Sequence, residues 1–127
     1  MSLDPMKQHG VFSWNELMTT DVEAAKSFYS ALFGWQIRDA DGPMPYSMAK
    51  VGEQDVAGIM PMAPEAQGQP PAWGAYVTVD DVDACASKTE QLGGKVVLPA
   101  QDIPDVGRFA VISDPQGAIL MIITYSM

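Results

Sequence analysis

An internal repeat is the feature of this sequence that most constrains its fold. Residues 21–25, Asp-Val-Glu-Ala-Ala, return at 81–85 as Asp-Val-Asp-Ala-Cys, an offset of 81 − 21 = 60 positions. The same offset aligns Leu32 with Leu92 and Gly34 with Gly94. Because one offset holds across a whole element and its flanks, the sequence predicts two copies of one structural unit.

Each copy is predicted to contain a strand, a helix and then three strands. Apolar segments at 11–18 and 75–79 lead to Asp21 and Asp81, whose carboxylates suit the N-caps of helices. The expected helices cover 22–33 and 82–92, and glycines follow both. The expected later strands cover 34–38, 46–51 and 56–62 in the first copy, and 95–98, 108–113 and 118–125 in the second.

This pattern predicts an α+β fold in which two βαβββ modules each supply a curved sheet to one shared core. The expected modules span 8–62 and 72–127, with a proline-rich linker over 63–71 between them. They would make a single domain over 6–127, because residues 1–5 are interpreted as an expression scar.

Composition limits the partners that such a domain can have. A single histidine, His9, and a single cysteine, Cys85, exclude a structural zinc cluster and a disulfide framework. Sixteen acidic residues against seven basic ones give a formal charge of −9, so neither nucleic acid nor a membrane surface is an expected partner. With neither a spanning apolar run nor an export signal, the sequence favours a cytoplasmic location.

Several motifs resemble the vicinal oxygen chelate superfamily, the glyoxalase, bleomycin-resistance and extradiol-dioxygenase group. The first module carries the resemblance at 14–21 and in Leu32-Phe33-Gly34-Trp35, and the second carries it at 79–84 and 114–117. The resemblance covers residues 9–125 and implies a glyoxalase-like protein in which the two modules form a curved mixed sheet around a shared cavity. It does not imply one reaction, because this scaffold hosts lyases, isomerases, oxygenases and drug-binding proteins without catalysis.

The resemblance also implies where the metal ligands of the superfamily would stand. The corresponding positions hold Trp14, Gly74, Met121 and Pro61, the last with Met60 beside it. Hard divalent cations prefer carboxylate oxygens or imidazole nitrogens, which none of these side chains offers. We therefore expect no metal and no other cofactor, although a displaced ligand set including Glu16 is the alternative.

Strand alternation selects the candidate catalytic residues, Glu16 and Tyr76. If Trp14 points into the cavity, Glu16 does so too, and Tyr76 stands at the repeat offset from Glu16. A carboxylate beside Trp14 would have its charged form disfavoured, which suits a general acid or base. The alternative is that Glu16 is a hydrogen-bonded structural group.

The candidate ligand-binding residues are mostly large and apolar. Tryptophan and methionine suit an adaptable pocket for a small organic molecule, and an arginine can recognise a carboxylate or pair with a neighbour such as Asp105. Trp35 is expected in the core instead. The residues selected are Trp14, Met60, Trp73, Arg108 and Met121.

Three functions follow from these expectations, and all leave open whether the protein is an enzyme. The first is metal-independent binding, with or without turnover, of a small organic molecule in a Trp- and Met-lined cavity. The second is a metal-dependent lyase or dioxygenase in which Glu16 is a displaced ligand. The third is a stress or regulatory module without chemistry. A homodimer is expected because an apolar fraction of 47% leaves surface to cover.

Overall fold

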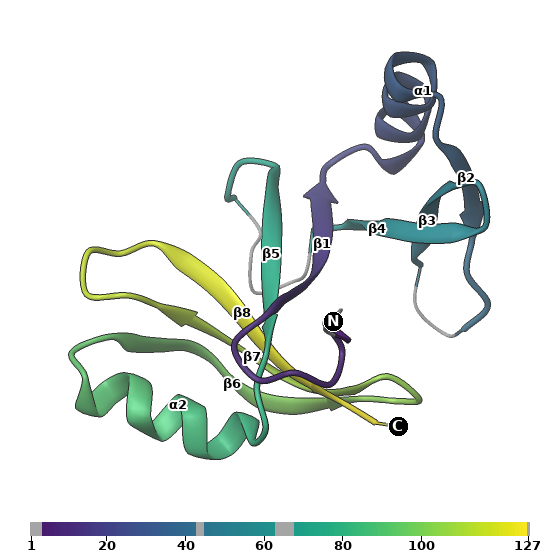
Figure 1. Ribbon diagram of the computed structural model, residues 1–127. Helices are drawn as coiled ribbons and strands as arrows, with labels where there is room; N and C mark the ends of the chain where they lie inside the picture. The colour runs from purple at the N-terminus through teal and green to yellow at the C-terminus, as the bar shows by residue number, and fades with distance from the viewer. Residues whose placement is uncertain (1–3, 43–44, 63–67, 127) are drawn as a thin grey trace. The chain divides into compact units, whose positions relative to one another are not determined.

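The computed structural model describes residues 4–42, 45–62 and 68–126, and within them the chain forms eight strands and two helices (Figure 1). Both halves follow the predicted order of strand, helix and three strands, which confirms the α+β class. The first half contains β1 (Phe12–Thr19), α1 (Val22–Phe33), β2 (Gln36–Asp39), β3 (Ser47–Val51) and β4 (Gln54–Pro61). The second contains β5 (Ala72–Thr78), α2 (Val82–Gln91), β6 (Lys95–Ile103), β7 (Gly107–Ser113) and β8 (Ile119–Tyr125).

The chain divides into two compact units whose boundaries differ from those of the predicted modules. Trp14–Gly74 forms the first unit, and the segment before Trp14 joins the residues from Ala75 onward in the second. Backbone hydrogen bonds explain this, since Gly10 N–H donates to the Thr78 carbonyl at 2.8 Å and Thr78 N–H donates to that of Val11 at 2.9 Å. The predicted boundary at residue 8 therefore lies several residues too early. Part of the expected linker, 63–67, lies outside the described residues.

The first unit contains a sheet in the order β2-β3-β4-β1. β1 runs parallel to β4, and β3 is antiparallel to both β2 and β4. α1 follows β1 and, with β2 and β3, forms the connection to β4. Its N-cap Asp21 accepts a hydrogen bond from Ala24 N at 3.0 Å. Gly34 ends the helix in the left-handed conformation, with φ of 74°. α1 contacts β2 and β4, so it covers one face of this sheet.

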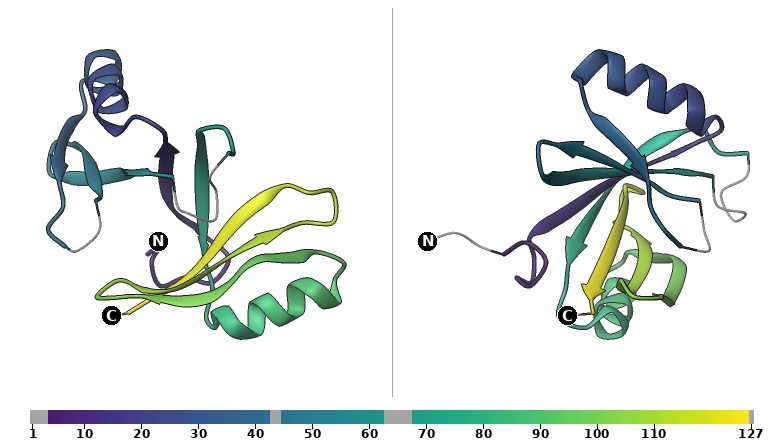
Figure 2. Two further views of the ribbon diagram at one scale, coloured as in Figure 1. Left: turned by 180° about the vertical axis from the view of Figure 1, so that it is seen from behind. Right: turned by 90° about the vertical axis from the view of Figure 1, so that its right-hand side faces the viewer.

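The second unit repeats the arrangement in a sheet ordered β5-β8-β7-β6. β5 is parallel to β8, and the remaining neighbours are antiparallel. α2 lies along this sheet (Figure 2) and begins at Asp81, which accepts from Ala84 N at 3.1 Å. The hydrophobic core of the second unit consists of Val79, Val82, Ala110 and Ile122.

Two local features of the second unit refine the predicted elements. The predicted β7–β8 hairpin is present, with the Asp114 carboxylate accepting from the backbone of Gln116 and Ala118 at 3.0 Å each. β6 is longer than predicted and continues through Pro99 to Ile103. Because β6 is an edge strand and its register shifts between Leu98 and Gln101, a residue without N–H is tolerated there.

Two further features of the fold concern the burial of Cys85 and the length of the helices. Cys85 is partly buried against the core of the second unit, and this desolvation raises the pKa of its thiol, as suits an unreactive small hydrophobe. Among the described residues, neither helix has the length and apolar character needed to span a bilayer.

Candidate functional site

A tryptophan and a tyrosine are joined on one face of the first-unit sheet. Trp14 of β1 donates from its indole Nε1 to the Tyr46 hydroxyl oxygen at 2.8 Å. The Tyr46 ring lies over Gly58 of β4, where an added Cβ would collide with the tyrosine hydroxyl and ring. The missing side chain at Gly58 is therefore what lets this aromatic pair form.

Glu16 supplies a carboxylate to the same face. Its side chain is 7% exposed, and it pairs with Gly58 across the parallel β1–β4 ladder. Alternate residues of a strand share a face, and paired residues of neighbouring strands lie side by side. By these rules the face also carries Met18, Met48 and Met60. The first unit thus brings Trp14, Glu16 and Met60 onto one face, which we call the Trp14 face.

Tyr76 and Met121 are neighbours in the second unit. They pair across the parallel β5–β8 ladder and are 6% and 4% exposed. The Tyr76 ring lies 6.5 Å from that of Phe109 in β7. Tyr76 and Met121 therefore share one face of the second-unit sheet. That Glu16 and Tyr76 face each other stays a prediction.

Arg108 does not lie beside Tyr76 and Met121, the other candidate site residues of the second unit. Phe109 contacts Tyr76, so strand alternation puts Arg108 on the opposite, α2-covered face of the sheet. Its Nε and Nη2 donate to the Asp83 carboxylate at 2.8 and 3.0 Å, and its Nη1 donates to Asp102 at 3.1 Å. Arg108 thus pairs with Asp83 and Asp102, and not with Asp105, the partner suggested by the sequence. Arg108 therefore joins α2 to β6 and does not share the face of Tyr76 and Met121.

Trp73 also lies apart from Trp14. It belongs to an aromatic cluster with Tyr29 and Trp35, in which Trp73 Nε1 donates to the Tyr29 hydroxyl oxygen at 3.1 Å. Asn15 lines the same groove, so by alternation Trp14 lies on the other face of the sheet. The prediction that Trp14 and Trp73 line one cavity is wrong for this reason. The groove has a volume of about 380 Å³, and its remaining lining residues are Phe33, Val56 and Ala57.

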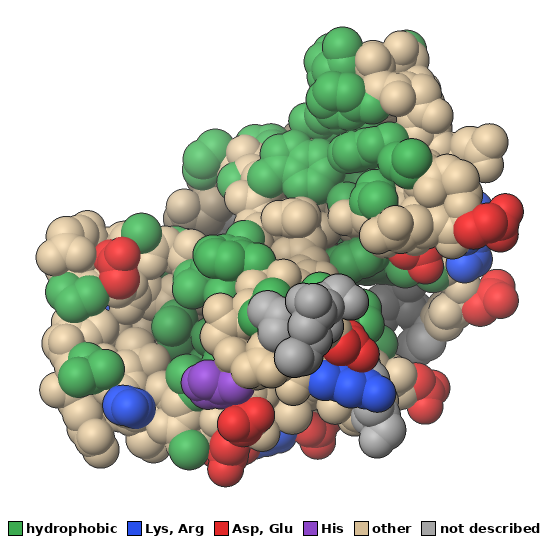
Figure 3. Space-filling view, in the orientation of Figure 1, with side chains coloured by type: hydrophobic (Ala, Val, Ile, Leu, Met, Phe, Trp, Pro, Cys, Tyr) green, Lys and Arg blue, Asp and Glu red, His purple; other side chains and the backbone are tan. Residues whose placement is uncertain are grey.

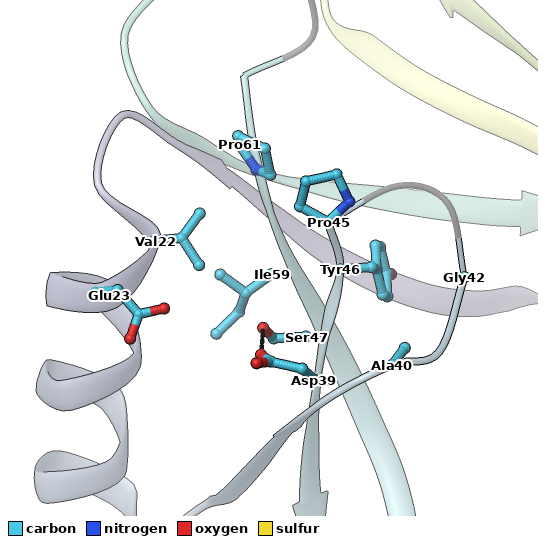
Figure 4. A pocket seen from close by; sticks show the side chains of 10 residues that line it. All are labelled: Val22, Glu23, Asp39, Ala40, Gly42, Pro45, Tyr46, Ser47, Ile59 and Pro61. Carbon is cyan, nitrogen blue, oxygen red and sulfur yellow. Dashed lines mark hydrogen bonds between the residues drawn. The ribbon is translucent and has the colours of Figure 1, made fainter.

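A second cleft of about 360 Å³ opens near the N-terminus of α1 (Figure 4). Its floor is apolar, with Val22 and Ile59, and its rim carries Asp39. Asp39 accepts from Ser47 at 2.8 Å and from Lys26 at 3.0 Å, and these bonds, chiefly the one from Lys26, lower the pKa of Asp39. Asp39 is consequently ionised and paired near neutral pH, which does not suit a proton-transfer role.

The residues at the expected metal positions do not fit a divalent cation. Trp14 donates its only side-chain N–H to Tyr46, and Met121 is packed beside Tyr76. Gly74 and Pro61 offer no side-chain donor. Within the described residues, no group of three histidine, cysteine or acidic side chains is close enough to hold a metal ion. We therefore derive no chemical step through a metal.

Comparison with known proteins identifies the family. The sequence profile of the Glyoxalase/Bleomycin resistance protein/Dioxygenase superfamily matches residues 11–122. The chain belongs to this superfamily. The chain is 48% identical over 117 residues to "Putative glyoxylase CFP32" of Mycobacterium bovis, an alignment covering 87% of this chain and 44% of that protein. It is 32% identical over 124 residues to the anthracycline biosynthesis protein DnrV of Streptomyces peucetius, covering 86% and 45%.

This glyoxalase-superfamily chain therefore spans less than half the length of these relatives. Among solved structures, methylmalonyl-CoA epimerase of Mycobacterium tuberculosis superposes with a TM-score of 0.64 at 17% identity, covering 100% of this chain and 94% of the epimerase. At this identity the likeness supports the glyoxalase-like fold alone.

Sequence reasoning missed Tyr46 as a part of the site. The signal that pointed to it was Gly58, because a glycine inside a strand often marks the close approach of another group. At the repeat offset the second module has Ala118, so the fold itself does not require a glycine there. The ion pair between Arg108 and Asp83 was missed because it joins residues far apart in the sequence.

Proposed function

We propose that this superfamily member binds a small, flat organic molecule on its Trp14 face without the metal centre expected for its superfamily. The observation that carries this is the hydrogen bond from Trp14 to Tyr46 over Gly58. It fixes a large indole ring beside three methionines, whose flexible side chains adapt to the outline of a ligand. A ring fixed before binding loses little conformational entropy when a ligand arrives.

Glu16 gives this apolar face one polar anchor. Glu16 as a whole residue is 7% exposed, and it lies on the same strand face as Trp14. A carboxylate in such surroundings is suited to accept a hydrogen bond from a hydroxyl group of the ligand or to move a proton. In this proposal the methionines and Trp14 supply contact area, and Glu16 is the candidate acid–base group of any turnover.

The relatives support the choice of a flat ligand. Two Streptomyces proteins, 31% and 32% identical to this chain, are named for anthracycline biosynthesis. Anthracyclines are planar polycyclic compounds, and planar rings stack well on indole and pack against methionine. A neutral anthracycline aglycone is therefore a suitable first probe, because a cationic one would bind a chain of charge −9 nonspecifically.

The test compares Trp14 with Trp73, which lies in the aromatic groove on the α1 side of the first-unit sheet. The aglycone is titrated into chelator-treated wild type, Trp14→Phe and Trp73→Phe, and binding is followed by calorimetry. We expect Trp14→Phe to weaken binding about tenfold, roughly 1.4 kcal/mol, and Trp73→Phe to leave it unchanged. Failure of the wild type to bind, or an equal effect of both variants, would overturn the proposal.

Metal analysis tests the alternative of a metal-dependent lyase or dioxygenase. Protein purified without chelator or affinity tag is analysed for Ni, Zn, Mn and Fe, alongside Glu16→Ala and the control Glu53→Ala. Glu53 is an exposed carboxylate in the turn between β3 and β4. We expect sub-stoichiometric metal in all three. One metal per chain that disappears only in Glu16→Ala would replace the proposal with the alternative.

A further inference from the structure

One row of paired residues crosses the first-unit sheet on the Trp14 face. Glu16 of β1 pairs with Gly58 of β4, and Gly58 pairs in turn with Met48 of β3. Met48 pairs with Arg38 of β2, which is the edge strand. Because paired residues of neighbouring strands share a face, Arg38 also lies on the Trp14 face. The row therefore has a carboxylate at one end and a guanidinium at the other.

The two charged ends of this row are separated by its apolar middle. Neighbouring strands lie about 4.8 Å apart, so the three steps from β1 to β2 put the backbones of Glu16 and Arg38 about 14 Å apart. Met48 and Gly58, which lies under the Tyr46 ring, occupy the space between them. A flat ligand that covers the row thus meets a different charge at each end.

The guanidinium of Arg38 is available to a ligand. Arg38 is exposed, and in the part of the chain that the structure describes it forms no ion pair with a carboxylate. Lys50 of β3 differs, because its ammonium pairs with Asp55 at 3.3 Å. Arg108 is likewise paired, with Asp83 at 2.8 Å. The planar set of N–H donors on Arg38 is therefore free to recognise an acceptor.

The second module shows that the fold needs neither charged end of the row. At the repeat offset, Glu16 corresponds to Tyr76 and Arg38 to Leu98. Leu98 lies in an edge strand too, where it pairs with Val111. The same scaffold is thus uncharged at both positions in its second copy. The charges of Glu16 and Arg38 therefore belong to the Trp14 face and not to the requirements of the fold.

The chemistry of Arg38 and the charge of the chain together indicate which acceptor fits. A guanidinium donates two parallel hydrogen bonds to the oxygens of a carboxylate or a phosphate. The chain carries a formal charge of −9, and Figure 3 shows acidic side chains at several places on the face that it draws. A doubly charged phosphate would keep one unneutralised charge in this repelling field, whereas Arg38 alone neutralises a carboxylate.

We propose that the ligand of the Trp14 face is a flat organic acid whose carboxylate is bound by Arg38. This inference rests on the proposed function, in which Trp14 and the methionines contact the flat body of the ligand. The carboxylate lies at the β2 edge, and the ring system extends over Met48 toward Glu16. Arg38 thus takes the role in carboxylate recognition that the sequence suggested for Arg108.

The test compares a carboxylate with its neutral amide on one ring system. Anthraquinone-2-carboxylate and anthraquinone-2-carboxamide are titrated into chelator-treated wild type, Arg38→Gln and Lys95→Gln, and binding is followed by calorimetry. Lys95 is an exposed residue of β6 in the second unit, so both variants change the net charge equally but only one changes the Trp14 face.

The expected result is a preference for the acid that depends on Arg38 alone. Wild type and Lys95→Gln should bind the carboxylate about fivefold more tightly than the amide, as for a favourable exposed ion pair. Arg38→Gln should bind the two probes equally, with its affinity for the amide unchanged. The preference of wild type should also shrink as salt is added, because salt screens exposed charges.

The neutral amide separates this inference from the proposed function. If wild type binds the amide but does not prefer the acid, or if Arg38→Gln keeps the preference, Arg38 is only a solvated charge on an edge strand, and the inference fails while the proposed function stands. If neither probe binds, the proposed function fails and this inference fails with it.

Nitrogen-15 NMR of the indole groups locates the bound acid. Anthraquinone-2-carboxylate should shift the Trp14 signal both in wild type and in Arg38→Gln, because the flat body occupies the same face in each. An acid that shifts the Trp73 signal and leaves that of Trp14 in place would contradict the inference.

Discussion

The two units of this protein share their chain order and helix starts but differ in where their apolar residues go. Asp21 and Asp81 cap their helices through bonds of 3.0 and 3.1 Å to the equivalent backbone nitrogens. Beyond the cap the units diverge, because α2 buries Val82 in a core with Ile122 whereas no residue of α1 is buried. The two copies of the repeat thus share the capping residues and the order of elements that form the fold, whereas the burial of their helix residues differs.

This difference assigns separate tasks to the two units. The second unit has a hydrophobic core of its own. In this unit Arg108 also donates hydrogen bonds to Asp83 of α2 and Asp102 of β6, which join the helix to the edge strand. The first unit carries the Trp14 face on one side of its sheet and the aromatic groove with Tyr29 and Trp73 on the other. In our account, the ligand-binding surface therefore lies in the first unit.

The largest expected effect is a difference in stability between alanine variants of two equivalent valines, one in each unit. Val82 is 2% exposed in the core of α2, whereas its counterpart Val22 is only partly buried. We expect Val82→Ala to lower the free energy of unfolding by about 1.5–3 kcal/mol and Val22→Ala by less than half as much. Urea denaturation measures both, and equal losses would break the proposed difference between the units.

The next effect concerns the glycine that distinguishes the Trp14 face. Gly58→Ala gives the first unit the residue that the second has at Ala118, but it forces Tyr46 away from its position. We expect a loss of about 1–3 kcal/mol of stability, as in other overpacked sites, together with altered fluorescence of Trp14. Tyr46→Phe is the matched variant, since it removes only the hydroxyl acceptor. Unchanged stability in Gly58→Ala would refute the described packing.

A smaller effect tests the feature that the units share. Asp21→Ala and Asp81→Ala each remove one N-cap hydrogen bond of nearly equal length. We expect each to cost ~1 kcal/mol of unfolding free energy, and the two costs to agree within about 0.5 kcal/mol. Thermal denaturation monitored by circular dichroism gives both values. A clear inequality would show that the repeat is less regular than its caps suggest.

The smallest effect is the pH dependence of the exposed Arg108–Asp83 pair. The hydrogen bonds from Arg108 hold the pKa of Asp83 below its ordinary value of 3.8. A carboxylate with a lowered folded-state pKa stabilises the protein above its unfolded pKa, and this stabilisation is lost as pH falls through the folded value. Asp83→Asn should therefore lower the urea midpoint slightly at pH 7 and have no effect well below pH 3.8. The exposed Asp41→Asn is the control, and an effect of Asp83→Asn that persists in acid would contradict the ion pair.

The fold was predictable because the residues that start and end its elements act on nearby backbone groups, and because most of these signals occur in both copies of the repeat. Asp21 with the glycine after α1, and the turn at Asp114, fix element boundaries through nearby backbone groups. Strand alternation puts Trp14 and Glu16 on one face of β1, and Tyr76 pairs with Met121 across the β5–β8 ladder. The roles predicted for these residues stay predictions. The repeat and the strand and helix patterns of each half then gave the order of the elements, and the family resemblance agreed with that order.

The rest of the candidate site depended on contacts that the sequence does not encode locally. Trp73 sits at the start of β5, where its ring reaches α1 and packs on Tyr29 rather than following the face of Trp14. Arg108 selected Asp83, which is 25 residues away, instead of Asp105 nearby. Both errors arose because long side chains choose partners by tertiary packing, which neither spacing nor residue type reveals.

The central claim, that the ligand binds on the Trp14 face of the first unit and not in the aromatic groove on the other face of its sheet, is tested most directly by nitrogen-15 NMR of the indole groups. The chain has three tryptophans, so its spectrum contains three indole N–H signals. In chelator-treated protein, the aglycone should shift the Trp14 signal and leave the signals of Trp35 and Trp73 in place. An aglycone that shifts Trp73 and Trp35 while Trp14 stays unmoved would contradict the account.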